Sequence, residues 1–483
     1  IFDKNKFGLN KKYFKNTLLT SFILLISFIL TFDNNDIYRF KNEWNKVYVA
    51  NNFGIYTYQL KDISFVLKRL ILPNLGKEKA MKSLENYEFN YNKNNQYTNI
   101  FKDKNILLIH AESVQSMFVE ASINGNEIMP NLSKLANEGL YFTNYYSQES
   151  VGTSSDTEFT LNNSILPVGV GTVFLNYEKN DYLSTPNILK ENGYYTFSMH
   201  GNTCEYWNRN NMYLKFGYDH FYCYDEYNLS DRIGLGLSDK SFFSQSADFI
   251  KQIDETYDKY YGTLIMLTNH APFYNEGKVD FDVSYLEGTN IGDYIKLLHY
   301  ADEAIGEFIN KLDENNLLDD TVIVIYGDHD SKLKTKEYDY YLNYDLENNQ
   351  MLDKNSEDYI DIDFYTYEDL TKVPLIIWTK DKTVQGRIDE VMGTYDVLPT
   401  LGNMFDFESK YQLGNDIFSV DENIVVFPNG NWRTNKVYYN GQNKEYKLLT
   451  DEVVSEEYLK EKEEYAKKIV ETSNNLIKYN LFE

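Results

Sequence analysis

The sequence predicts an α/β fold in which a mostly parallel β-sheet carries helices on both faces. From Ile100 onward, short apolar runs alternate with helical patterns, which is the order typical of parallel sheets. Val322–Tyr326 is apolar at all five positions, as expected for a central strand with neither face in water. At 483 residues the chain can form one large domain of this kind with additional segments.

Residues 17–34 are predicted to form a transmembrane helix. Thr17–Phe32 contains no charge, and five lysines precede it between positions 4 and 15. Sixteen helical residues cover about 24 Å, and the residues just before them could complete a hydrocarbon span of about 30 Å. A cleaved secretion signal is the alternative, but Asp33–Asp36 follows where small residues would be expected. Because the chain begins at Ile1, we expect further segments before it.

The lysines predict the topology of the chain. Positive residues favour the cytoplasmic side, so residues 1–16 would be a cytoplasmic basic segment and everything after Asp33 would be extracellular. Residues 35–99 are predicted to be a membrane-proximal helical linker that ends in a flexible tether, 76–99. Residues 100–420 would then form the catalytic domain, and residues 421–483 a small C-terminal subdomain of strands and a closing helix.

Composition excludes some classes of function. The formal net charge of −26 argues against a nucleic-acid partner, because phosphates would be repelled. Two cysteines, Cys204 and Cys223, rule out a disulfide scaffold, and they could equally form one bridge or remain free. Abundant Asn, Lys, Ile and Tyr indicate a low-GC bacterial genome and carry no functional meaning.

Helices are predicted from their apolar spacing and from Pro and Gly at their ends. The segments that show these features are Pro130–Gly139, Pro186–Gly193, Tyr294–Leu312, Tyr395–Phe405 and Ser455–Ile477. The apolar runs between them are predicted strands. These are Ile106–Ile109, Tyr194–Met199, Thr263–Leu267, Val322–Tyr326 and Val373–Trp378.

Four predicted strands end in residues that can bind a metal or a phosphate. Glu112 follows the first of these strands, His200 the second, His270 the third, and Asp328 and His329 the fourth. Ligands bind at the carboxyl ends of the strands in open α/β sheets. We therefore expect Glu112, Asp328 and His329 to surround one divalent ion together with a Ser or Thr oxygen.

The segment Gly152–Phe159, GTSSDTEF, could supply that oxygen. Its hydroxyl residues are typical of a capped helix start, and Glu158 could close a capping box. A helix start also presents free N–H groups to a phosphate, and a nearby metal lowers the pKa of a hydroxyl. The same geometry therefore suits the nucleophile of a phosphoryl transfer.

Five motifs together resemble those of the lipoteichoic acid synthase family. They are HAES at Glu112, GTSSDTEF, MHGNTCEYWNR, TNHAPF and YGDHD. The resemblance extends from Ile100 to Glu483. It implies a sulfatase/alkaline-phosphatase-like extracellular domain, attached to the cell membrane of a Gram-positive bacterium. It also implies transfer of glycerol phosphate from phosphatidylglycerol to a glycolipid-anchored or polyglycerolphosphate acceptor, through a covalent glycerophosphoryl-enzyme.

The resemblance also implies roles for individual residues. The metal, Mn²⁺ or another divalent ion such as Mg²⁺, would be held by Glu112, the nucleophile, Asp328 and His329. The substrate would contact the four residues Trp207, Arg209, His200 and His270, and His270 could also take part in catalysis. Trp207 and Arg209 would grip the glycerol and the phosphate, for which the planar guanidinium fork is suited.

The nucleophile position departs from the family pattern. Alignment through Asp156, Glu158 and Phe159 places the family's threonine nucleophile at Ser154, whereas a shift of one residue would make it Thr153. Either hydroxyl could perform the chemistry.

Three other functions remain to be distinguished. A lipoteichoic acid primase would use the same site, and a related phosphatase or phosphodiesterase would use water as its acceptor. A domain that has lost catalysis would keep the metal alone. A sulfatase activity is disfavoured, because no Cys/Ser-x-Pro-x-Arg motif surrounds the nucleophile.

Overall fold

The computed structural model describes residues 11–32, 36–37, 40, 46–71, 76–275 and 277–482. The chain divides into two compact units, Ile1–Pro73 and Asn74–Glu483. The described residues of the first unit include the helices α1 (Lys11–Ile29), α3 (Lys46–Phe53) and α4 (Ile55–Ile71).

The predicted transmembrane helix over residues 17–34 is not found in that form. Helix α1 begins six residues earlier, within the lysine-containing segment, and ends at Ile29. It therefore includes fewer of the uncharged residues than predicted. Within the described residues, none of the helices combines the length and the apolar character needed to cross a bilayer.

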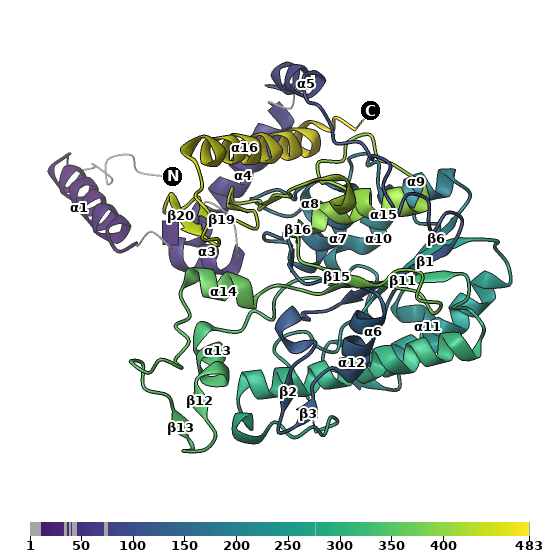
Figure 1. Ribbon diagram of the computed structural model, residues 1–483. Coiled ribbons are helices and arrows are strands. Elements are labelled where there is room, and N and C mark those ends of the chain that lie inside the picture. The colour runs from purple at the N-terminus through teal and green to yellow at the C-terminus, as the bar shows by residue number, and fades with distance from the viewer. Residues whose placement is uncertain are drawn as a thin grey trace, which may run out of the picture. The chain divides into compact units, whose positions relative to one another are not determined.

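The second unit is built on an eight-stranded sheet with the order β15-β4-β14-β11-β1-β10-β6-β7 (Figure 1). The pairs β11–β1, β1–β10, β10–β6 and β6–β7 are parallel, while β14 is antiparallel to both of its neighbours. The mostly parallel sheet predicted from the sequence is therefore confirmed. The strands are β1 (Asn105–Ala111), β4 (Leu140–Phe142), β6 (Tyr195–His200), β7 (His220–Tyr222), β10 (Tyr260–Ile265), β11 (Thr321–Gly327), β14 (Leu375–Trp378) and β15 (Gly386–Ile388).

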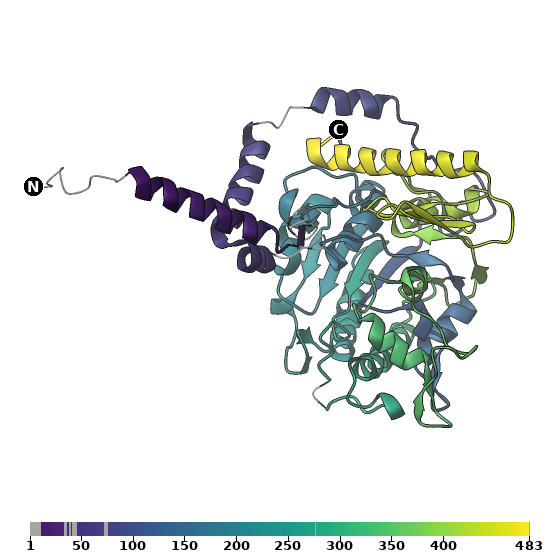
Figure 2. The same ribbon diagram turned by 90° about the vertical axis from the view of Figure 1, so that its left-hand side faces the viewer.

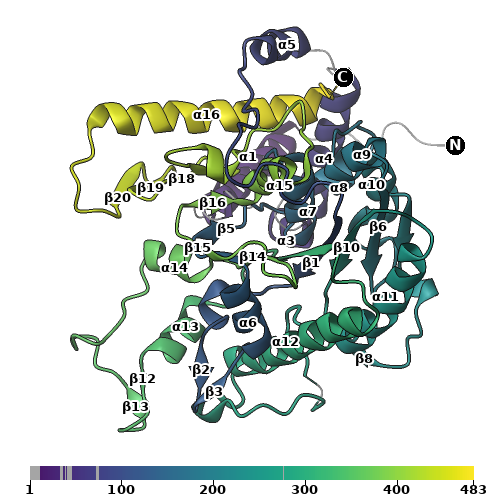
Figure 3. The same ribbon diagram turned by 45° about the vertical axis from the view of Figure 1, so that its right-hand side comes forward.

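Helices cover both faces of this sheet (Figures 1 and 3). One face carries α6 (Pro130–Glu138), α11 (Asp239–Asp254) and α12 (Asn290–Glu314). The other carries α7 (Ser154–Asn163), α9 (Thr185–Glu191), α10 (Arg209–Phe216) and α15 (Val397–Phe405). Strand β1 is buried along its whole length. Leu108 packs in the same core as Phe159 of α7, and Leu107 in the core that contains Ile295 of α12, because successive side chains point to opposite faces.

The C-terminal residues form a second, antiparallel sheet of β17 (Val425–Val426), β18 (Trp432–Arg433), β19 (Val437–Asn440) and β20 (Glu445–Leu448). Helix α16 (Glu456–Tyr479) follows it. These elements belong to the same compact unit as the large sheet, so the predicted boundary at residue 420 stays a prediction.

Smaller elements complete the second unit. The helices α8 (Val173–Asn176), α13 (Thr335–Leu342) and α14 (Phe364–Leu370) are short. Two-stranded ribbons pair β2 (Ser122–Ile123) with β3 (Asn126–Glu127), β5 (Tyr145–Tyr146) with β16 (Met392–Gly393), β8 (Arg232–Ile233) with β9 (Gly236–Leu237), and β12 (Tyr344–Asp345) with β13 (Gln350–Met351).

The prediction of a flexible tether over residues 76–99 is wrong. Helix α5 (Lys77–Glu85) lies alongside α16, as Figure 2 shows. The residues after α5 are hydrogen-bonded to the second unit: Asn95 Nδ2 donates to Asp416 Oδ2 at 2.7 Å, and Asn99 N donates to the carbonyl of Asn403 at 2.8 Å. Abundant Asn suggested a solvated chain, but its amides and backbone instead bond to α15 and to the loop after it.

Candidate active site

The carboxyl ends of neighbouring strands bring the predicted metal ligands together. Strands β1 and β11 pair in parallel register, with Ala111 opposite Gly327. Glu112 and Asp328 are the next residues after these strands, and both are buried. The structure therefore brings these two carboxylates together at one edge of the sheet.

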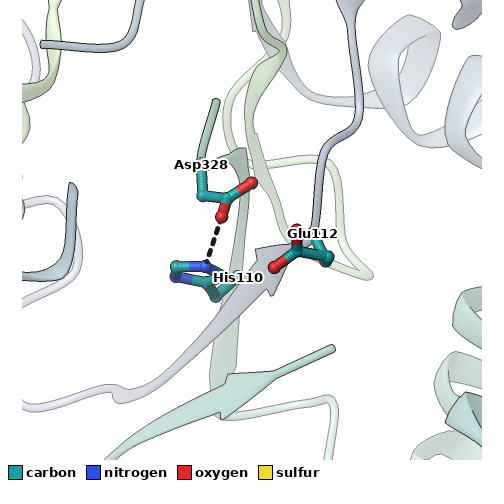
Figure 4. Close-up of side chains that lie close together, drawn as sticks. All are labelled: His110, Glu112 and Asp328. Atoms are coloured by element: carbon teal, nitrogen blue, oxygen red, sulfur yellow. Dashed lines mark hydrogen bonds and ion pairs between the residues drawn. The ribbon is translucent and has the colours of Figure 1, made fainter. Parts of the chain in front are cut away.

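A third residue, His110, joins the two carboxylates (Figure 4). Ligand atoms of His110, Glu112 and Asp328 all lie within 4.8 Å of one another. His110 Nε2 is 3.0 Å from Asp328 Oδ2, and its Nδ1 is 3.0 Å from the hydroxyl of Tyr326. The sequence interpretation did not assign a role to His110. Its place in the HAES motif, two residues before Glu112 and thus on the same side of the strand, was the available signal.

His329 completes the predicted set from the other side. Its Nε2 lies 3.1 Å from Asp328 Oδ2 and 3.6 Å from Glu112 Oε1. Its Nδ1 lies 2.7 Å from the carbonyl of Asp330, which indicates that Nδ1 carries the proton and Nε2 the lone pair. Burial alone would lower the pKa of His329, but the charges of Asp328 and Glu112 raise it above its ordinary value.

The helix α7 begins at Ser154, beside these ligands. Ser154 is buried, and its Oγ lies 3.2 Å from His329 Nε2. Thr153 is the residue before the helix, is only half-buried, and makes no capping hydrogen bond through its side chain. Of the two candidate hydroxyls, the Ser154 hydroxyl therefore has the contact with a predicted ligand.

Hydrogen bonds hold this helix start in place. Asp156 Oδ2 accepts from the backbone N–H groups of Ser150 at 3.0 Å and Gly152 at 2.8 Å, and Thr157 Oγ1 donates to the carbonyl of Asp328 at 2.6 Å. A Cβ at Gly152 would lie 2.3 Å from Asp156 Oδ1, so the turn requires glycine. Burial raises the pKa of Asp156 to about 8, although the two N–H donors oppose this rise.

Arg209, the first residue of α10, is fixed by the buried carboxylate of Glu158 in α7. Its Nε and Nη2 both donate to Glu158 Oε1, at 3.1 and 2.5 Å. The hydroxyl of Tyr213 donates to the other oxygen of Glu158. Arg209 Nη1 is buried and has no hydrogen-bond partner among the residues that the structure describes. Sequence reasoning gave Glu158 a capping role, whereas the structure uses it to orient the arginine.

The remaining predicted substrate contacts are His200, Trp207 and His270. His200 ends β6 and is buried, with Nδ1 3.2 Å from the carbonyl of Ile265. Its Nε2 has no hydrogen-bond partner in the described part of the chain. Burial and the charge of Arg209 lower the pKa of His200 well below its ordinary value, so the ring is neutral. Trp207 is half-buried and has a positive φ of 57°, which is unusual for a bulky residue. His270 is half-buried, with Nδ1 2.5 Å from the carbonyl of Ala271.

A disulfide encloses the segment that carries Trp207 and Arg209. Cys204 and Cys223 are bonded, with a Cα–Cα distance of 5.4 Å. The alternative of two free thiols is therefore excluded. The bridge ties the start of the Trp207 turn to the residue that follows β7.

The donor set suits a hard-to-borderline divalent ion. Glu112 and Asp328 are buried carboxylates, and in the described part of the chain their ion-pair partners are histidines, not lysine or arginine. Burying two carboxylates without a cation is costly. Two carboxylates, an imidazole nitrogen and the Ser154 hydroxyl would offset that cost by holding a metal.

Comparisons with known proteins agree with this geometry. The sulfatase family matches residues 104–407. Lipoteichoic acid synthase 2 of Bacillus subtilis is 30% identical over 98% of this chain and 72% of its own length. Lipoteichoic acid synthase of Staphylococcus aureus is 33% identical over 90% of this chain and 67% of its own length, and the chain spans 60% of the enzyme from Staphylococcus saprophyticus.

A solved structure leads to the same family. The lipoteichoic acid synthase LtaP from Listeria monocytogenes has a TM-score of 0.72 at 26% identity, over 82% of this chain and 98% of that structure. The fold, the buried metal-type cluster and these relatives agree with the motifs quoted from the sequence. The chain belongs to the sulfatase family and, within it, to the lipoteichoic acid synthases.

Proposed function

We propose that the chain, a phosphoglycerol transferase, moves glycerol phosphate from phosphatidylglycerol to a polyglycerolphosphate chain or to its glycolipid anchor. Its relatives are named lipoteichoic acid synthases, and the chain covers most of the length of several of them. The observation that carries the proposal is the contact between the Ser154 hydroxyl and His329 beside two buried carboxylates. This arrangement supports Ser154 as the nucleophile and the ends of β1 and β11 as the position of the metal.

In the first half-reaction, Ser154 Oγ forms a bond to the phosphorus of phosphatidylglycerol. The bond from phosphorus to the diacylglycerol oxygen breaks, the serine loses its proton, and the leaving oxygen gains one. In the second half-reaction, a glycerol hydroxyl of the acceptor forms a bond to the phosphorus and loses its proton. The bond from phosphorus to Ser154 Oγ breaks, and the serine regains a proton. His270, half-buried and with its Nδ1 occupied by a carbonyl, is the proposed residue to exchange a proton with these oxygens.

The other site residues bind and orient the substrate. Arg209 keeps one free, buried Nη1, which can donate to a phosphate oxygen while Glu158 holds the rest of the guanidinium. Neutral His200 offers an unpartnered Nε2, and half-buried Trp207 offers a face for the glycerol. Glu112, Asp328, His329 and Ser154 would hold the metal, proposed as Mn²⁺ or Mg²⁺. When bound, it would stabilise the serine alkoxide and the charge on the phosphoryl oxygens.

We further propose that the enzyme works at the outer surface of the cell membrane, where its lipid donor lies. The basic segment before the apolar stretch supports this orientation. A primase that adds a single unit and a hydrolase that uses water are the alternatives with the same site. All three enzymes would carry out the first half-reaction in the same way and would differ in the acceptor of the second. The experiment must therefore identify the acceptor.

Incubation with fluorescent phosphatidylglycerol and MnCl₂ tests the proposal. Release of diacylglycerol together with products longer than one glycerol phosphate is the expected result. Diacylglycerol with free glycerol phosphate alone would indicate a hydrolase, and a single added unit would indicate a primase. Absence of diacylglycerol with every divalent ion tried would contradict the transferase function.

A further inference from the structure

Helix α4 of the first unit presents an apolar stripe to solvent. Tyr56, Leu60, Ile63 and Leu67 recur at intervals of four, three and four residues, which places them on one face of a helix. Their exposed fractions are 79, 68, 52 and 45%. Exposed apolar side chains in a continuous row mark a binding surface more often than a free one.

The other side of α4 is already occupied within the same unit. Lys61 lies away from the stripe around the helix, donates a hydrogen bond to the carbonyl of Phe40, and lies over its ring at 4.6 Å. Helix α3 also packs against α4. These contacts hold the helix with the stripe outward, so the stripe needs a partner from outside the unit.

Charge indicates what that partner is. Residues 1–73 contain eleven lysines and arginines and five acidic residues, a net charge of +6. Because the whole chain carries −26, residues 74–483 carry −32. The unit that exposes the apolar stripe thus has a net positive charge, whereas the second unit has a net negative one. Residues 33–73, which contain α4 and follow the predicted membrane segment, hold six lysines and arginines and four acidic residues, a net charge of +2. A second copy would bring +2 against +2, whereas an anionic lipid surface attracts this segment.

The same unit exposes further apolar surface on α1, where Phe22, Ile23 and Leu24 are 54 to 64% exposed. An amphipathic helix with exposed Tyr, Leu and Ile in a basic segment is the pattern of helices that lie in a membrane interface. We infer that α4 is such a helix: its Tyr56–Leu67 stripe inserts into the surface of an anionic bilayer, with the helix axis parallel to the membrane. This inference does not depend on the proposed catalytic function.

Site-specific fluorescence on the full chain tests it. Both native cysteines are in the disulfide, so a single introduced cysteine can be labelled with an environment-sensitive dye. Leu60→Cys and Ile63→Cys report on the stripe, and Asp62→Cys, an exposed position facing elsewhere on the same helix, is the matched control. The variants are mixed with vesicles of phosphatidylglycerol and phosphatidylcholine that contain doxyl-labelled lipid.

Dyes at positions 60 and 63 should shift to shorter wavelength and be quenched at least twofold more than the dye at position 62. A Leu60→Glu change, read from a dye at Leu67→Cys, should abolish that quenching. Vesicles of phosphatidylcholine alone should quench several-fold less, because the basic charge has no counterpart there. Equal quenching at positions 60, 62 and 63 would overturn the inference. A blue shift at 60 and 63 that grows with protein concentration without vesicles would overturn it too, since a second copy would then cover the stripe.

Discussion

The hydroxyl of Ser154 lies 3.2 Å from Nε2 of His329, although the two residues are 175 positions apart in the chain. One begins a helix, and the other follows the end of a central strand. Because the same imidazole nitrogen is 3.1 Å from Asp328, the hydroxyl lies beside the predicted metal ligands and at the start of a helix. A hydroxyl in this position can be activated and can approach a phosphate bound at the helix start.

Replacing Ser154 with Ala should abolish diacylglycerol release while the fold is retained. The change removes the nucleophile, so the covalent route is lost. The cost in stability should be only about 1 kcal/mol, as for one hydroxyl at a helix start. Diacylglycerol release from fluorescent phosphatidylglycerol measures turnover, and urea unfolding measures stability.

Thr153→Ala and Ser154→Thr are the matched controls. Both should keep most of the turnover, because Thr153 makes no capping bond through its side chain and threonine supplies the same hydroxyl at position 154. Activity in Ser154→Ala combined with its loss in Thr153→Ala would identify Thr153 as the nucleophile. Full activity in the double Ala variant would exclude the covalent mechanism.

Removing either buried carboxylate should remove metal binding. Glu112→Gln and Asp328→Asn each delete a charged ligand from the cluster, and we expect Mn²⁺ affinity to fall at least about 100-fold, since even outer contacts of metal ligands are worth 10 to 100-fold. Isothermal titration calorimetry with MnCl₂ measures this. Wild type should gain about 2.7 kcal/mol of stability when Mn²⁺ is present at 100 times its Kd. Neither variant should show that gain.

Glu149→Gln is the control, because Glu149 pairs with Lys332 at 2.6 Å and is not a member of the His110, Glu112, Asp328 cluster. Its Mn²⁺ affinity should stay within a few-fold of wild type. If Glu112→Gln and Glu149→Gln weakened binding equally, the effect would be one of general charge and the site would lie elsewhere.

The central sheet and the meeting of Glu112 with Asp328 could be predicted from the sequence because their signals are local. Val322–Tyr326 is apolar throughout, and the strand that contains it ends immediately before Asp328. Parallel pairing then determines that Glu112 and Asp328 are neighbours. No long-range information was needed beyond the rule that strand ends meet at one edge.

Residues whose roles depend on distant partners could not be predicted in the same way. Glu158 reads as a helix-capping residue from its spacing, yet its carboxylate binds Arg209, which lies 51 positions later. The pairing of Cys204 with Cys223 and the docking of Asn95 on Asp416 depend on how loops pack, and residue spacing does not encode this. His110 is a strand residue whose side chain could equally have been a core histidine.

Arg209→Ala should reduce both stability and transfer. Arg209 and Glu158 are each about 2% exposed, so removing the arginine leaves a buried carboxylate without its cation. Breaking a buried pair in this way costs about 3 to 5 kcal/mol. Urea unfolding should show that loss. Steady-state kinetics should show a higher KM for phosphatidylglycerol, while Mn²⁺ affinity stays close to the wild-type value.

Glu158→Gln separates the two effects. It keeps the guanidinium but removes the carboxylate that orients it. The free energy of unfolding should therefore fall, and KM for phosphatidylglycerol should rise less than it does in Arg209→Ala. If Glu158→Gln left the free energy of unfolding unchanged, the pair would not contribute to the stability of the folded state, and Arg209 would act on the substrate alone.

The stability of the second unit should depend on pH through Asp239, which orients the loop before His270. Asp239 Oδ1 accepts from the N–H of Leu267 at 2.9 Å, and Oδ2 accepts from that of Thr268 at 3.2 Å. Burial raises the pKa of Asp239 from 3.8 to about 7, although these hydrogen bonds oppose the rise. As pH increases, Asp239 therefore loses its proton at a lower pH in the unfolded chain than in the folded protein, and this favours unfolding. The contribution of this residue is complete below pH 4 and is lost as pH rises through 7. At roughly 1.4 kcal/mol for each pKa unit, the loss could reach roughly 4 kcal/mol.

Urea unfolding of wild type and Asp239→Asn at pH 4, 6 and 8 isolates the effect, because Asn does not titrate. The free energy of unfolding of wild type minus that of Asp239→Asn should fall as pH increases. If this value rose with pH, the two N–H donors would outweigh burial, and the folded protein would stabilise the charged form of the Asp239 carboxylate.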